Sequence, residues 1–253
     1  LKSGGLTATQ LFTSNISLTS EIVTAYTVAE LTEGGYSSTS ISDAGGGLPD
    51  GAGLQEYINA GITDVPTLKG VGFTAAELRG VGYTLNVLLA AQYTVAQLKT
   101  AAYTAAELKT AGVTLSALID VGYTVSNLKN AGFTVTELKP SFTIAQLKTA
   151  GFTAAELKSV GVSLSDMVNL GFNVTQLKTA GFTATELTAV SFTLSDLMNA
   201  QYTVDELKAA AYTAAELKAS GFDLGALVDA GFSATQLKGA SYSATDLKPH
   251  FTI

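Results

Sequence analysis

A ten-residue unit, represented by Phe152 to Gly161 (FTAAELKSVG), repeats end to end from Phe73 to His250. We call this unit the decamer and number its positions 1 to 10. Position 1 is mostly aromatic, position 2 mostly Thr, position 6 Leu, position 7 mostly Lys, and position 10 often Gly. One decamer is too short to fold alone, so the pattern predicts an array in which neighbouring copies stabilise one another.

Each decamer carries the signals that begin and end a short α-helix. Where position 2 is not Thr, it is Ser, Asn or Asp, and these are the side chains that cap helix N-termini. Position 5 is Glu or Gln in most copies, which completes a capping box, and the residues at positions 1 and 6 have the spacing of a hydrophobic staple. Gly at position 10 suits the left-handed residue that ends a helix. The decamer therefore predicts a helix of about two turns.

The fold class that follows is all-α: a solenoid with one two-turn helix per decamer. A second pattern recurs every third decamer, where Leu at position 3 accompanies an apolar residue in place of the Lys at position 7. We interpret this spacing as about three helices per superhelical turn, which would align these apolar residues as a stripe. The stripe is either a covered edge of the core or a self-association surface. Its residues are Leu89, Ile119, Val168, Met198 and Val228.

The same sequence can also be divided into units of five residues, and this division is compatible with a second fold. Read in fives, the decamer places a small residue two positions before each Leu or Phe, which resembles the right-handed β-helix of pentapeptide-repeat proteins. The resemblance is partial, because position 3 is apolar throughout and one pentapeptide in two carries Gly. The capping residues and the Ala, Leu, Glu and Lys content favour helices.

The repeats predict three regions along one continuous solenoid. Residues 1–51 hold degenerate decamers and end in a Gly- and Pro-rich loop, Gly45 to Gly51. Residues 52–141 and 142–253 form two blocks, because the sequence QYTV occurs once in each and each ends near a shortened decamer with Pro140 or Pro249. The chain begins and ends within a decamer, so we expect a segment of a longer array or a protomer whose ends complement each other.

Composition argues against several classes of function. The sequence has no Cys. It contains 14 Lys and Arg and 21 Asp and Glu, which gives a net charge of −7. This balance argues against a nucleic-acid partner, which requires a clustered positive face. No apolar run approaches the roughly 20 residues of a membrane helix, so we expect no membrane insertion.

The side chains that could carry chemistry are few or are assigned to helix caps. His250 is the only histidine, and one imidazole cannot form a multi-histidine metal site. Most carboxylates stand at the capping position, so we expect no catalytic residues, no metal, no cofactor and no enzymatic activity. Asn15 and Asn173 begin N-glycosylation sequons, and glycosylation at either is a hypothesis.

The pattern [FY]-[TSND]-x-x-[EQD]-L-K-x-A-G resembles the tandem decapeptide-repeat proteins of algae, large viruses and bacteria, over roughly residues 6 to 253. The resemblance implies a repetitive structural or surface protein. We expect a self-assembling filament, appendage or virion-associated fibre whose partners are copies of itself, located outside the cell or on a cell or virion surface. The alternative is a monomeric solenoid scaffold or adhesin that recognises a protein or a glycan.

Overall fold

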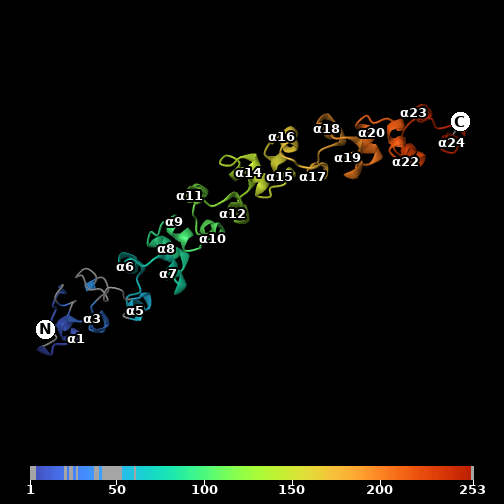
Figure 1. Cartoon of the computed structure of the whole chain (residues 1–253). Coiled ribbons are helices and arrows are strands. Elements are labelled where there is room, and N and C mark those ends of the chain that lie inside the picture. The colour runs from blue at the N-terminus through green and yellow to red at the C-terminus, as the bar shows by residue number, and fades with distance from the viewer. Residues whose placement is uncertain are drawn as a thin grey trace. The chain divides into compact units, whose positions relative to one another are not determined.

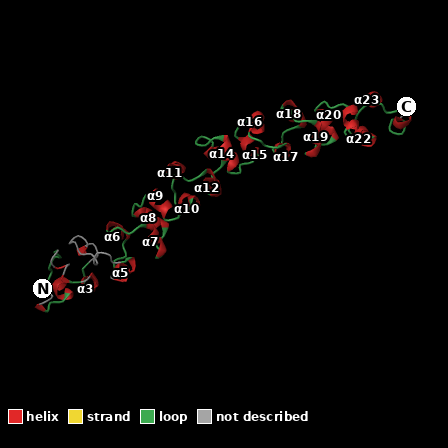
Figure 2. Cartoon of the chain, viewed as in Figure 1, coloured by secondary structure: helices red, strands yellow, loops and turns green. Residues whose placement is uncertain are grey.

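The structure is a computed structural model of the 253-residue chain, and it describes residues 4–19, 22, 25–26, 28–36, 40–41, 53–59 and 61–251. Every regular element in these residues is a short helix, and none of them is a strand (Figure 2). The predicted all-α fold is confirmed. The alternative of a right-handed β-helix is wrong, because the decamers are helical where it required extended backbone.

The chain divides into two compact units, Leu1–Gly132 and Phe133–Ile253, which we describe separately. The helices of the N-terminal unit are α1 (Ala8–Thr13), α3 (Val28–Glu33), α5 (Leu54–Asn59), α6 (Val65–Gly70), α7 (Ala75–Gly80), α8 (Leu85–Ala90), α9 (Val95–Thr100), α10 (Ala105–Thr110), α11 (Leu115–Asp120) and α12 (Val125–Asn130). Those of the C-terminal unit are α13 (Val135–Leu138), α14 (Ile144–Thr149), α15 (Ala154–Ser159), α16 (Leu164–Asn169), α17 (Val174–Thr179), α18 (Ala184–Ala189), α19 (Leu194–Asn199), α20 (Val204–Ala209), α21 (Ala214–Ala219), α22 (Leu224–Asp229), α23 (Ala234–Gly239) and α24 (Ala244–Leu247).

Helix α15 shows how one decamer folds. The Glu156 N–H donates to the Thr153 hydroxyl at 3.2 Å, and the Thr153 N–H donates to the Glu156 carboxylate at 2.7 Å. This is the predicted capping box. At the other end Gly161 has φ +76°, its N–H donates to the Lys158 carbonyl, and the Val162 N–H donates to the Leu157 carbonyl. These two bonds form a Schellman motif, which satisfies carbonyls that the helix end would leave free.

Two positions of the decamer serve two helix ends at once. Phe152 follows the turn that ends α14 and precedes the cap of α15, so it is both C″ of one helix and N′ of the next. Leu157 is both the fourth residue of α15 and the residue whose carbonyl closes its Schellman motif. Phe152 is 3% exposed and Leu157 is 0% exposed. The period of ten therefore follows from two cap motifs that share residues and leave no linker between them.

The largest helix contacts in each unit join a helix to the second helix along the chain. In the C-terminal unit α15 packs on α17, α17 on α19, α18 on α20, and α21 on α23. In the N-terminal unit α1 packs on α3, α7 on α9, and α10 on α12. Figure 1 shows the two resulting rows in the C-terminal unit, with α16 and α18 on one side and α17 and α19 on the other. The solenoid thus has two helices per superhelical turn, and the predicted three per turn is wrong.

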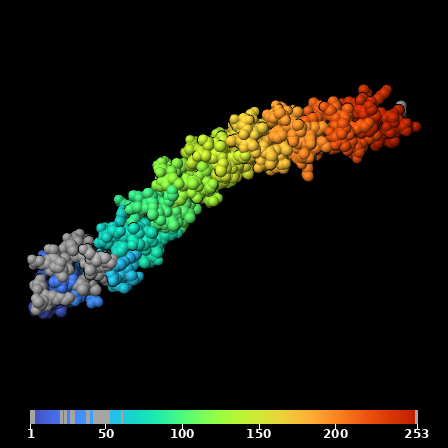
Figure 3. All heavy atoms as spheres, in the orientation of Figure 1, coloured from blue at the N-terminus to red at the C-terminus, as the bar shows by residue number. Residues whose placement is uncertain are grey.

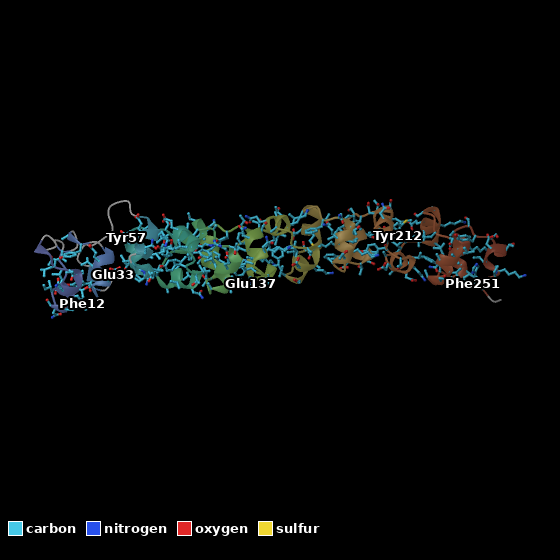
Figure 4. All side chains as sticks on the ribbon, turned by 90° about the horizontal axis from the view of Figure 1, so that it is seen from below. Phe12, Glu33, Tyr57, Glu137, Tyr212 and Phe251 are labelled. Atoms are coloured by element: carbon cyan, nitrogen blue, oxygen red, sulfur yellow. The ribbon has the colours of Figure 1, made fainter. Side chains whose placement is uncertain are left out.

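Stacking is local within each unit. In Figure 3 the colour changes steadily along the C-terminal unit, so each decamer contacts only decamers close to it in sequence. Figure 4 shows the side chains along the ribbon, and those that are buried are apolar or aromatic. No buried polar or charged side chain occurs in the described part of the chain. The core contains the position-6 residues, many of the large side chains at position 1, apolar residues at position 3 and, in several decamers, alanine at position 9, such as Ala200 and Ala230.

Proline shortens two decamers, as predicted. Helices α13 and α24 end at Leu138 and Leu247 after four residues each, and Pro140 and Pro249 lie two residues further on. After α13 both the Ser141 and Phe142 N–H groups donate to the Leu138 carbonyl, which closes a turn one residue shorter than usual. The division into regions 1–51, 52–141 and 142–253 stays a prediction. The glycine-rich loop from Gly45 to Gly51 lies outside the described residues.

Candidate functional site

The basic side chain at position 7 reaches the turn after the next helix of its own row. Lys158 of α15 donates to the Gly181 carbonyl at 2.9 Å, and its Nζ lies 3.9 Å from the centre of the Phe182 ring. Gly181 and Phe182 follow α17. We call a residue in this place a clamp residue. Basic clamp residues with both a turn carbonyl and a ring as partners include Lys69, Arg79, Lys99, Lys148, Lys158, Lys178, Lys208 and Lys218.

Two physical effects place a cation there. The carbonyls at a helix C-terminus carry partial negative charge and lack intrahelical donors, so an ammonium group both neutralises and satisfies them. The face of an aromatic ring also attracts a cation. Position 10 is often Gly, where a Cβ on Gly231 would lie 3.3 Å from the Lys208 Nζ, but the clamp also forms at Gln201, whose carbonyl accepts from Lys178. The clamp thus joins a basic residue, a turn carbonyl and a ring from three different decamers.

Tyrosine at position 1 adds a second contact between decamers. The Tyr202 hydroxyl donates to the Phe182 carbonyl at 2.5 Å, and the Tyr93 hydroxyl donates to the Phe73 carbonyl at the same distance. Donor and acceptor are 20 residues apart, which is one superhelical turn. Burial, with added repulsion from Glu206 and Glu186, raises the pKa of Tyr202 to about 12. This hydroxyl is therefore a structural donor and stays protonated at neutral pH.

The capping carboxylates also have structural partners. Hydrogen bonds from the Thr183 N–H and hydroxyl lower the pKa of Glu186 below its ordinary value, and Lys158 contributes in the same direction. The same bonds from Thr74 lower the pKa of Glu77. A general acid would need a raised pKa. These carboxylates are held ionised and committed to helix caps.

The five predicted stripe residues do not form one stripe. Leu89, Ile119, Val168, Met198 and Val228 are all partly buried. They belong to α8, α11, α16, α19 and α22, which are three helices apart within each unit. Because rows contain every second helix, consecutive members of this set within a unit fall in opposite rows. The prediction of aligned apolar residues is wrong in that respect, while self-association through them stays a prediction.

An apolar side chain can occupy the place of the clamp. A clamp residue meets position 1 of the third decamer after its own, as Lys158 meets Phe182. In the N-terminal unit Phe12 packs edge to face on Tyr36 in the same relation, with ring centres 5.2 Å apart. Leu89 has the same relation in sequence to Val113. Position 7 can therefore contact a later decamer through a charged or an apolar side chain.

Shallow grooves recur where helices with Ala at positions 3 and 4 begin. One, of about 370 Å³, lies between Ala154 and Ala155 of α15 and Gln176 of α17, with Lys148 at one wall. A groove of about 490 Å³ has the same layout, with Ala214 and Ala215 of α21 in the equivalent place. The N-terminal unit has a third, of about 330 Å³, beside Ala75 and Ala76.

The predicted glycosylation residues both lie on the surface. Asn15 is exposed and has φ 54°, in the turn after α1. Asn173 is exposed and caps α17, with its Oδ1 accepting from the Gln176 N–H at 2.9 Å. Glycosylation at either residue stays a hypothesis. His250 is exposed, and no cluster of three or more His, Cys, Asp or Glu that could hold a metal ion occurs among the described residues.

Comparison with known proteins identifies the repeat. A family model described as a decapeptide repeat region matches residues 63–135, 141–214 and 201–250, which together exceed half of the chain. The chain belongs to the decapeptide repeat family. No curated protein and no solved structure matches it at a significant level. None of the helices in the described part of this decapeptide repeat protein is long and apolar enough to cross a bilayer.

Sequence reasoning found the caps of the decapeptide repeat but missed the clamp and the grooves. It assigned no partner to Lys at position 7, although most of these lysines are partly buried against a later turn. The spacing could not reveal the clamp, because most decamers offer both a Lys and an aromatic residue. Partners one, two, three or four decamers away are therefore equally available in the sequence. Only the path of the chain between helices decides which pair meets.

Proposed function

We propose that this decapeptide repeat protein is a non-enzymatic structural protein that self-associates into a filament, appendage, or surface or virion-associated fibre. The observation that carries the proposal is how the recurring chemical groups are used. Lysines hold turns, tyrosine hydroxyls hold carbonyls, and capping carboxylates hold helix N-termini. These contacts stabilise the array itself, so we interpret the repeated residues as the means of building a regular structure.

The apolar clamp residues supply the contact chemistry for association. They are partly buried and alternate between the two rows of helices in each unit. A protein that offers the same apolar contact on both rows can join a copy of itself on each side, which gives an open assembly and not a closed pair. The partners are therefore further copies of this chain, and a location outside the cell or on a cell or virion surface accords with a fibre.

Replacing apolar clamp residues by Lys tests the proposal. The variant V168K/M198K/V228K should lose assembly in negative-stain electron microscopy and sediment as a monomer at concentrations where the parent chain forms polymers. The control S165K/S195K adds charge to exposed positions of α16 and α19 and should assemble as the parent does. A monodisperse parent chain at high concentration would refute self-association.

A second candidate function is a monomeric scaffold or adhesin for a protein or a glycan. The observation that favours it is the recurrence of grooves with the same lining, beside Ala154 and Ala155 and again beside Ala214 and Ala215. Large side chains at these positions, as in A155W/A215W, should then abolish binding to the target and leave the oligomeric state unchanged. If the variant bound as the parent did, the grooves would not be the contact surface.

A further inference from the structure

Among the turns that follow six-residue helices of the C-terminal unit, three lack a basic clamp residue. They are 190–191 after α18, 210–211 after α20 and 220–221 after α21. The residues at their clamp positions are Val168, Thr188 and Met198, which carry no charge.

Thr188 shows what replaces the basic group at one of these turns. Its hydroxyl donates to the Ala184 carbonyl of its own helix at 2.8 Å and lies 3.5 Å from the Tyr212 hydroxyl. A neutral hydroxyl bonds more weakly than an ammonium group, and the Val168 and Met198 side chains offer no hydrogen to a carbonyl. These turns are therefore held less strongly from the neighbouring decamer.

The exposed fraction of the residue that follows each turn differs between turns with and without a basic clamp residue. Phe192, Tyr212 and Phe222, which follow the three turns without a basic clamp residue, are all partly exposed. After clamped turns in the interior of the same unit, the corresponding side chains are more deeply buried. Their exposed fractions are 5% for Phe172, 7% for Phe182, 4% for Tyr202 and 3% for Phe232. Tyr242 is partly exposed although Lys218 reaches its turn, and it begins the decamer that Pro249 shortens.

Backbone strain adds to the effect at two of the three turns. Ser191 has φ 75° and Ala211 has φ 67°, a left-handed conformation that disfavours residues with a Cβ. Gln201 and Ser241 have φ 63° and 60° in the same place, but their carbonyls accept hydrogen bonds from the ammonium groups of clamp lysines. In the C-terminal unit, strain without a clamp is therefore confined to the turns at Ser191 and Ala211.

We infer that the C-terminal unit opens locally at these three turns, so that its compliance is concentrated between residues 188 and 222. The residue at position 7 of a decamer determines how readily one later turn opens. That turn is the one directly before the third decamer further along the chain. This device is independent of the proposed function, because it acts within one chain.

Hydrogen exchange of one equivalent amide in each decamer tests the inference. The N–H of the position-1 residue donates to the carbonyl of the preceding position-6 residue, at 3.1 Å for Phe192, Tyr212 and Phe222 and at 3.0 to 3.1 Å for Phe172, Phe182, Tyr202 and Phe232. The chemistry and hydrogen bond of the probe are thus matched. We expect the first three amides to exchange about tenfold faster than the other four, which corresponds to about 1.4 kcal/mol. Equal exchange across all seven would overturn the inference.

Exchanging clamp residues separates the clamp from the strain. V168K and M198K should slow exchange at Phe192 and Phe222 to the rate of the clamped turns, whereas K178M should speed exchange at Tyr202 about tenfold. S191G removes the backbone strain and leaves the clamp position unchanged, so Phe192 should stay faster than Phe182 in that variant. If S191G alone equalised the two rates, or if V168K and K178M left them unchanged, the clamp would not control opening.

Discussion

The contribution of the tyrosine hydroxyl contact between decamers to the free energy of unfolding can be predicted. Tyr202 is 4% exposed, and its hydroxyl donates to the Phe182 carbonyl at 2.5 Å. Tyr202→Phe removes this donor and leaves a carbonyl without its partner, which costs about 1 to 2 kcal/mol. The contact with Lys178 is retained, because phenylalanine also accepts a lysine over its ring elsewhere in the array, as Phe182 does with Lys158. The variant therefore tests the hydroxyl alone.

Urea unfolding followed by circular dichroism measures the effect. The free energy of unfolding of Tyr202→Phe should fall by about 1 to 2 kcal/mol with an unchanged denaturant slope. Tyr212→Phe is the matched control, since the Tyr212 hydroxyl is exposed and its partner, Thr188, is 3.5 Å away. That control should change stability by less than about 0.5 kcal/mol. Equal losses in the two variants would refute the contact across one superhelical turn, and with it the two-helix turn.

Three further outcomes follow from the caps, the hydroxyls and the small residues. The capping bonds lower the pKa of Glu186 below its ordinary value of 4.5. The contribution of Glu186 to the stability of the fold is therefore complete above pH 4.5 and is lost as the pH falls through the lower pKa of the folded state. Acid titration of helicity should show this loss, and Thr183→Ala should reduce it. The pKa of Tyr202 is raised from 10.0 to about 12, so its contribution is complete below pH 10 and is lost between these values, which absorbance titration should detect. Ala154 is 3% exposed at the start of α15, where α15 packs on α17, so Ala154→Leu should destabilise the fold by about 1 to 3 kcal/mol in urea unfolding.

Local structure could be predicted from the sequence because each signal acts within one decamer. Thr153 and Glu156 form the predicted box, and Gly161 adopts the predicted left-handed conformation. These interactions join neighbours in the sequence, so neither depends on where other decamers lie. The apolar residue at position 6, such as Leu157, is buried in any arrangement that stacks the helices.

The arrangement of decamers could not be predicted, because it depends on the direction in which each turn sends the chain. The same helix with the same caps is compatible with two or three helices per turn. The spacing of Leu89 and Ile119 suggests a turn of three, whereas the helices pack on every second neighbour and Lys158 reaches the third decamer after its own. A period in the sequence therefore does not by itself give the number of helices per turn.

The pairing of every second helix limits how such a chain can grow. If one ten-residue copy is inserted, every later helix of that unit moves to the opposite row, and each lysine downstream of the junction still meets a turn. At the junction itself the neighbours change, so a buried alanine such as Ala154 would face a different side chain. Insertion of an even number of copies keeps every later helix of the unit in its own row. Expansion of the gene by pairs of decamers would therefore preserve the two rows beyond the junction.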